Sequence, residues 1–206
     1  MVGLCLFGMS LGLVIESTLG NAPWDVLHQG LTHYLPISLG MVTIGVSLLV
    51  LLLWIPLRQR PGIGTVANAV VVGVTIDLCL LLAPTPEALP ARIGFLVAGI
   101  VLNAIGGALY IGAQLGPGPR DGLMTGLMAR TGRPVWLIRT AIELSVVVIG
   151  FLLGGKLWIG TVAYAFGVGP LIQLFLPRVI VWLPRADVLR EQRRRPAPSP
   201  ADQTAD

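Results

Sequence analysis

Leu19-Gly20-Asn21-Ala22-Pro23-Trp24-Asp25-Val26-Leu27 interrupts an apolar run near the start of the chain, and the expected architecture follows from this interruption. A second stretch of the same kind, Leu115-Gly116-Pro117-Gly118-Pro119-Arg120-Asp121-Gly122-Leu123, begins 96 positions later. Glycine and proline both break helices. The aspartate after each break falls in the first turn of a short helix, where a carboxylate interacts favourably with the helix dipole. We therefore predict helix breaks at Gly20, Pro23, Gly116 and Pro119.

The offset of 96 positions persists along most of the chain. Apolar residues would match by chance at any offset, but matches of glycine, proline, aspartate and threonine would not. Such matches pair Gly20 with Gly116, Pro23 with Pro119, Asp25 with Asp121, Gly30 with Gly126, and Gly64-Thr65 with Gly160-Thr161. The pattern indicates an internal duplication, with repeat one over about 4–84 and repeat two over about 100–180.

The composition indicates that lipid surrounds most of the chain. Hydrophobic residues make up 54% of the 206 residues and charged residues only 12%, whereas a typical soluble domain has about 25% charged residues. The mean hydropathy is +0.82. We expect an integral membrane domain over 1–190 in contact with the bilayer, and a disordered cytoplasmic tail over 191–206 that is polar and rich in proline and alanine. No basic face with interleaved aromatic residues occurs outside the tail, so a nucleic-acid partner is not expected.

Six apolar segments have about the length needed to cross the hydrocarbon core, at 2–19, 39–57, 65–82, 92–115, 134–153 and 161–176. Two shorter helices are expected at 23–35, with Asn21 as its cap, and at 119–131. They would lie in the interface or re-enter the membrane. If they crossed fully, each half would have four spans and the repeats would be parallel; their polar residues disfavour this. The sequence predicts an all-α membrane protein of about six transmembrane helices, arranged as two inverted three-helix repeats, each with a short broken helix after its first span.

Basic residues provide a test of this topology. If both termini are cytoplasmic, the outer side receives Arg92 and Lys156 as its only cations, beside Asp25 and Glu87. The cytoplasmic side receives the arginine-rich tail together with Arg58, Arg60, Arg120, Arg130 and Arg133. This asymmetry agrees with the positive-inside rule.

The stretch 19–30, Leu-Gly-Asn-Ala-Pro-Trp-Asp-Val-Leu-His-Gln-Gly, resembles the signature of the YczE/YyaS/YitT family of bacterial membrane proteins. The stretch 116–124, Gly-Pro-Gly-Pro-Arg-Asp-Gly-Leu-Met, is similar to the second hallmark of that family. The resemblance covers about 4–176. It implies a multi-pass protein of the bacterial plasma membrane, and it brings neither an established activity nor catalytic residues.

The paired breaks are the best candidates for a binding site, because discontinuous helices form substrate and ion sites in many transporters. Asp25 and Asp121 would then bind a cation or a proton. Alternatively, each aspartate only satisfies amides in its own helix turn. Arg139 and Glu143 are spaced to pair on one helix face, and ionisable residues within a span are functional candidates. Arg139 could instead bridge to Asp121 or Glu16. Arg120 and Glu16 complete the candidate set.

No pattern in the sequence indicates an enzyme, a cofactor or a metal centre. A nucleophile with an adjacent base is not evident, His28 and His33 lack further ligands, and a phosphate-binding glycine-rich motif is absent. We expect a permease or exporter of a small solute, coupled to ions or protons. The alternative is a scaffold for a membrane-bound biosynthetic or regulatory complex. A six-span unit of this size could need to form a homodimer to enclose a pathway, although nothing in the sequence demands it.

Overall fold

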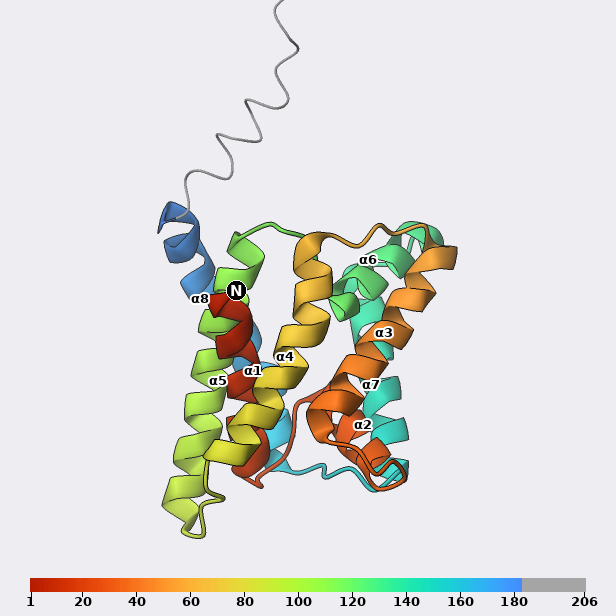
Figure 1. The fold of residues 1–206 in the computed structure, drawn as a ribbon. Helices are drawn as coiled ribbons and strands as arrows, with labels where there is room; N and C mark the ends of the chain where they lie inside the picture. Colours follow the sequence, from red (N-terminus) through yellow and green to blue (C-terminus); the bar gives the residue numbers. More distant parts are fainter. Residues whose placement is uncertain (183–206) are drawn as a thin grey trace, which may run out of the picture.

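The computed structural model describes residues 1–182, with side chains placed as far as Arg178, and that part of the chain is entirely α-helical (Figure 1). Its eight helices are α1 (Val2–Glu16), α2 (Pro23–Thr32), α3 (Leu39–Leu57), α4 (Ile63–Leu82), α5 (Leu89–Gly112), α6 (Pro119–Thr131), α7 (Val135–Leu152) and α8 (Ile159–Trp182). The predicted tail over 191–206 lies outside the described residues. The helices of the described residues confirm the prediction of an all-α membrane protein.

Five of these helices are long and apolar enough to cross a membrane, namely α3, α4, α5, α7 and α8. Helix α1 is apolar but has only 15 residues. It ends at Glu16, before the predicted 19, because the backbone leaves the helical region at Thr18, whose φ is 55°. Arg92 then donates from Nε to the Ser17 carbonyl and from Nη2 to the Thr18 carbonyl, at 3.0 and 3.2 Å. These bonds satisfy carbonyl groups that a helix end leaves free.

Several predicted helix ends differ from the structure, including both ends of α5, which spans Leu89–Gly112 and not 92–115. Helix α8 continues through Pro177 to Trp182, because helices in a bilayer can tolerate proline. Helix α2 ends at Thr32, and residues 33–37 form turns. Asn21 does not cap α2. The N-cap is Ala22, and the side-chain amide of Asn21 donates from Nδ2 to Gln29 Oε1 at 2.8 Å.

Small residues allow α1 to pack closely between α4 and α5. A Cβ atom built on Gly106 of α5 would lie 2.7 Å from the backbone nitrogen of Phe7, so the two helices meet almost backbone to backbone. Asn103 donates to Ser10 Oγ across the same buried contact, at 2.8 Å. Small side chains and interhelical hydrogen bonds are the usual means of association between helices in lipid. In the same way α5 packs between α1 and α8.

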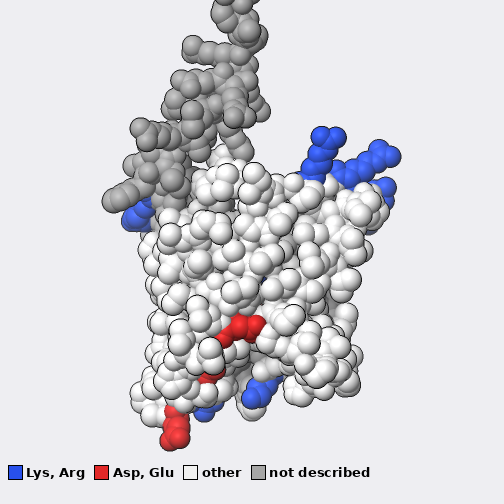
Figure 2. All heavy atoms as spheres, viewed as in Figure 1, with Lys and Arg blue, Asp and Glu red and all other residues white. Residues whose placement is uncertain are grey.

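The two short helices, α2 and α6, each pack against both α3 and α7. In Figure 1, α1 runs from the upper end of the molecule to the lower, and α5 runs from the lower end to the upper. The break before α2 therefore lies near the lower end and the break before α6 near the upper end. Figure 2 shows basic side chains gathered at the upper right, over the ends of α3 and α6, whereas the acidic side chains in view lie in the lower half. Uncharged surface fills most of the area between them.

Candidate functional site

The first break is anchored to the start of α8. The Gly160 amide donates to the Leu19 carbonyl at 2.7 Å, and the Asn21 amide donates to Thr161 Oγ1 at 3.1 Å. Gly20 lies between these anchors with φ of +130°, a conformation that glycine adopts without strain. The chain can therefore turn sharply from α1 into α2 against the end of another helix.

The second break is anchored to the start of α4 by bonds at equivalent positions. The Gly64 amide donates to the Leu115 carbonyl at 3.0 Å, and Thr65 Oγ1 donates to the Pro117 carbonyl at 2.7 Å. Gly116 has φ of +121°. Each of these residues stands 96 positions from its counterpart in the first break. Helix α1 ends at Glu16 and α2 begins at Pro23, whereas α5 ends at Gly112 and α6 begins at Pro119, so each break separates two helices.

Trp54 fixes the start of α6 against α3. Its indole Nε1 donates to the Pro119 carbonyl at 3.0 Å, and the side chain is almost fully buried. The ring fills the space beside Gly122, where an added Cβ would lie 1.9 Å from it. The position of the first turn of α6, and of the charged residues on it, thus depends on a rigid aromatic contact.

Both breaks reach one cavity of about 380 Å³. The first break contributes Ala22, Pro23 and Trp24, and the second contributes Gly118, Pro119, Arg120 and Asp121. The neighbouring helices add polar side chains, among them Thr43, Ser47, Asn68, Asn103, Tyr110, Arg139, Glu143 and Tyr164. The cavity wall thus combines these polar and charged groups with apolar side chains, between helices whose outer surfaces are apolar.

Arg120 connects the two breaks across this cavity. Its guanidinium carbon lies 4.9 Å from the centre of the Trp24 ring, within the range of a cation–π interaction. Its Nη2 atom lies 3.9 Å from Asp25 Oδ1. About a quarter of the Arg120 side chain is exposed, whereas Asp25 is fully buried. Helix α6 directs the Arg120 side chain into the cavity, where sequence analysis had placed Arg120 among the candidate site residues.

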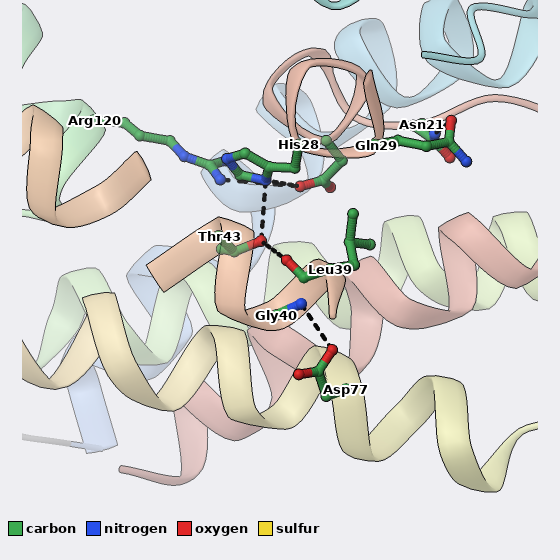
Figure 3. A network of polar contacts seen from close by, with 9 residues as sticks. Asn21, His28, Gln29, Leu39, Gly40, Thr43, Asp77 and Arg120 are labelled. Atoms are coloured by element: carbon green, nitrogen blue, oxygen red, sulfur yellow. Dashed lines mark hydrogen bonds and ion pairs between the residues drawn. The ribbon is translucent and has the colours of Figure 1, made fainter. Parts of the chain in front are cut away.

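Asp25 belongs to a buried polar cluster with His28 and Thr43 (Figure 3). His28 Nδ1 lies 3.1 Å from Asp25 Oδ1 and 3.1 Å from Thr43 Oγ1. The Thr43 hydroxyl donates to the Leu39 carbonyl at 2.9 Å. Among the described residues, Asp25 Oδ2 and His28 Nε2 have no hydrogen-bond partner. Buried polar atoms without partners are costly, and each needs an explanation.

Asp121, Arg139 and Glu143 lie on the wall of the cavity itself. Arg139 Nε donates to Glu143 Oε1 at 2.9 Å, which confirms the pairing predicted from their spacing. The alternative bridge from Arg139 to Glu16 is wrong, because Glu16 lies at the end of α1 and accepts a hydrogen bond from Thr85. Four of the six candidate charged residues thus line the cavity, Asp25 contacts one of them, Arg120, and Glu16 lies apart.

Comparisons with known proteins agree with the resemblance noted above. The model of DUF6198, a family of unknown function, matches residues 1–177. The chain belongs to the DUF6198 family. An uncharacterised protein of Haemophilus influenzae is 39% identical over 88% of this chain and 83% of its own length. The uncharacterised membrane protein YczE of Bacillus subtilis is 31% identical over 86% of this chain and 84% of its own length.

A second Bacillus subtilis relative, the uncharacterised protein YyaS, is 26% identical over 86% of this chain and 90% of its own length. No solved structure matches the chain. The resemblance to YczE and YyaS is therefore confirmed, and the similarity to YczE, which is named a membrane protein, together with the apolar helices supports a location in a membrane. The YitT part of the resemblance stays a prediction.

His28 is the main site residue of this DUF6198 protein that sequence reasoning missed. It was considered only as a metal ligand, and its spacing of three from Asp25 on one helix was the available signal. Its second partner, Thr43, lies on α3. That contact depends on how α2 packs, which the local sequence does not indicate.

Proposed function

We propose that this DUF6198 protein is a permease or exporter of a small solute. The observation that carries the proposal is that both helix breaks line one cavity whose wall carries polar and charged side chains. In transporters built from inverted repeats, broken helices place their termini at the substrate site. A scaffold would have no need for two distant breaks to meet at a common chamber.

The transport unit is an inverted repeat of three spans per half. Support comes from the offset of 96 positions, from the opposite directions of α1 and α5 in Figure 1, and from the matching anchors at Thr65 and Thr161. A helix of 15 residues is about 22 Å long, shorter than a hydrocarbon core of about 30 Å. The segment 17–22 therefore completes the first of six crossings.

The cytoplasmic face is the end that carries Arg58, Arg60, Arg130 and Arg133. The opposite end carries Arg92 and Lys156 as its basic residues among those described. Positively charged loops remain on the cytoplasmic side of a bacterial membrane. Both termini then lie in the cytoplasm, and the first break is approached from the outside.

The solute is compact and the coupling ion binds at the breaks. A volume of about 380 Å³ is near the lower end for small-molecule sites. Asp121 on the wall and Asp25 behind Arg120 are the carboxylates available to a cation or a proton. Charged groups are expensive in hydrocarbon, so their concentration at one chamber is best explained by a role in coupling.

Flux measurements in proteoliposomes test the proposal. Liposomes containing the full chain are loaded with a mixture of small radiolabelled solutes and placed under a proton gradient, and release is followed over time. The double variant Asp25→Asn plus Asp121→Asn is expected to reduce protein-dependent release to the background of empty liposomes. Glu87→Gln, a carboxyl-to-amide change in the exposed link between α4 and α5, is the matched control and should retain full release.

Release that survives the double variant would contradict the proposed site. Absence of protein-dependent release for every solute, together with purification of a fixed protein partner, would favour the scaffold. The same preparation tests whether the unit acts as a homodimer, because the mass of the reconstituted particle can be measured.

A further inference from the structure

We propose that the cavity binds a small organic monoanion at Arg120 and that this binding loads one proton onto His28. The inference deepens the proposed function by naming the class of solute and the group that carries the coupled proton. The consequence that anion and proton cross the membrane together rests on the proposed transport function. Binding and proton uptake can be measured without it.

The hydrogen bonds of Thr43 define where the proton goes. The Thr43 hydroxyl has one hydrogen, which it donates to the Leu39 carbonyl, so it can only accept from His28. His28 Nδ1 therefore carries a hydrogen, shared between Thr43 Oγ1 and Asp25 Oδ1. In the neutral imidazole, Nε2 then has a free lone pair, and this is the buried atom that lacks a partner among the described residues. It is a vacant proton acceptor on a ring whose other nitrogen, Nδ1, lies beside the Asp25 carboxylate.

Arg120 is the cation available to an anionic ligand. Its contact with Asp25 is a single approach of 3.9 Å, longer than a hydrogen bond. Arg139, the other cation on the cavity wall, is bound to Glu143 at 2.9 Å. Arg120 also lies over the Trp24 ring and is partly exposed to the cavity. A ligand carboxylate can therefore replace Asp25 as its counter-ion with little disruption.

The charges on the wall favour one negative charge on the ligand. Asp121 follows Arg120 on α6 and lines the same cavity, so it repels a second negative charge. Apolar side chains complete the wall, including Phe7, Trp24, Ile142 and Ile172. A carboxylate on a small apolar body matches both features.

Binding and protonation balance each other in charge. In the empty site, Arg120 is paired with Asp25 and His28 is neutral. When an anion pairs with Arg120, Asp25 loses its cation, and a proton added to His28 Nε2 gives an imidazolium that Asp25 holds through Nδ1–H. The proton comes from the solvent, so a bond to hydrogen in hydronium or a buffer acid breaks as the Nε2–H bond forms, and no bond between heavy atoms changes. The site has the same net charge before and after, which matters because an uncompensated charge in a low-dielectric interior costs several kcal/mol.

Among the described residues, few other charged groups face His28 and Asp25. Helix α6 contributes Arg120 and Asp121, and α7 contributes Arg139 and Glu143 on the cavity wall. Helix α8 contributes the Tyr164 phenol, and α3 contributes only the hydroxyls of Thr43 and Ser47. Of these groups, only Arg120 has a charged atom in a described contact with Asp25 apart from His28. Arg120 is thus the group whose movement changes the proton affinity of His28.

The test measures proton uptake on binding of acetate, butyrate or benzoate. The purified full chain in detergent, in weakly buffered solution near neutral pH with an indicator dye, is titrated with each sodium salt, and binding is followed by calorimetry. At least one anion should bind, with uptake of about one proton per bound anion. His28→Gln should keep anion binding and lose proton uptake, whereas Arg120→Gln should lose both. His33→Gln, the other histidine, is the matched control and should behave as the parent chain.

A second variant keeps the test decisive if His28→Gln does not fold. Asp25→Asn removes the carboxylate that holds the imidazolium, so uptake should require a pH lower by about one unit. The proposal is overturned if none of the anions binds, if binding releases protons or moves none, or if His28→Gln takes up protons as the parent does. Transport of an uncharged solute that survives His28→Gln would leave the permease standing and overturn the inference. Proton-linked binding without release from proteoliposomes would support the inference and contradict the permease.

Discussion

Gly40→Ala is expected to destabilise the folded chain by about 3 kcal/mol, at the upper end of the cost of overpacking. The Gly40 amide donates to Asp77 Oδ1 at 2.7 Å, which ties the start of α3 to α4 (Figure 3). An added Cβ would lie 2.1 Å from the Gly73 carbonyl oxygen and 2.5 Å from Asp77 Cγ. The first of these is a backbone atom, so relief requires the two helices to separate.

Gly45→Ala is the matched control, because it makes the same change on the same helix. Apart from its chain neighbours and the backbone of its own helix, no atom of the described chain lies within 4 Å of the added Cβ at this position. Alanine is favoured over glycine in a helix by up to about 1 kcal/mol, so stability should be unchanged or slightly higher. Thermal unfolding of both variants in detergent, followed by circular dichroism, makes the comparison. Equal midpoints would mean that α3 and α4 do not pack as described.

Arg120→Gln is expected to cost about 2 kcal/mol. Removing one partner of a buried ion pair typically costs about 3–5 kcal/mol, and the partial exposure of Arg120 lowers that value. The loss arises because Asp25, fully buried, retains a charge without its cation. Adding Asp25→Asn should restore most of the lost stability, since the amide has no charge to compensate. The double-mutant cycle measures this coupling directly.

The control for this cycle is Arg139→Gln, which breaks the other ion pair at the cavity. Both partners of that pair are substantially exposed in the structure, with side chains 61% and 34% accessible. Exposed pairs contribute less than about 1 kcal/mol. A loss from Arg139→Gln as large as that from Arg120→Gln, or no recovery when Asp25→Asn is added, would contradict the assignment of Arg120 to buried Asp25.

Local sequence signals predicted several helices accurately. The bounds 39–57 and 119–131 coincide with α3 and α6. Ser38 Oγ accepts from the Met41 amide at the start of α3, and Gly132 adopts a left-handed conformation at the end of α6. These are the signals that define helix ends in a sequence. The end of α1 was missed because it depends on Arg92, which lies far along the chain.

The candidate site likewise contains contacts that the sequence predicted and contacts that it did not predict. The pairing of Arg139 with Glu143 is a contact within one helix, and the sequence predicted it. The burial of Asp25 and its approach to Arg120 depend on how two short helices from opposite ends of the molecule meet. The spacing of Asp25 and Arg120 in the sequence carries no information on the distance between their side chains. Glu16 was included for its place at the end of an apolar run, yet α1 directs it away from the chamber.

A permease, as proposed, requires that the cavity between the breaks opens to each side of the membrane in turn. Cysteine labelling tests it most directly, in a chain whose own cysteines, Cys5 and Cys79, are replaced by alanine. Ser47→Cys places a thiol of similar size on the cavity wall. Its neighbour Leu48→Cys, half-exposed and outside the cavity lining, is the control. A membrane-impermeant thiol reagent is added to sealed vesicles of either orientation.

We predict that Ser47→Cys reacts from both sides and much faster than Leu48→Cys, because water reaches the cavity from each side in turn. The small organic anions should slow that reaction by occupying the chamber. Labelling of Ser47→Cys from one side only, or no faster than labelling of Leu48→Cys, would contradict the claim that this chamber is a transport pathway.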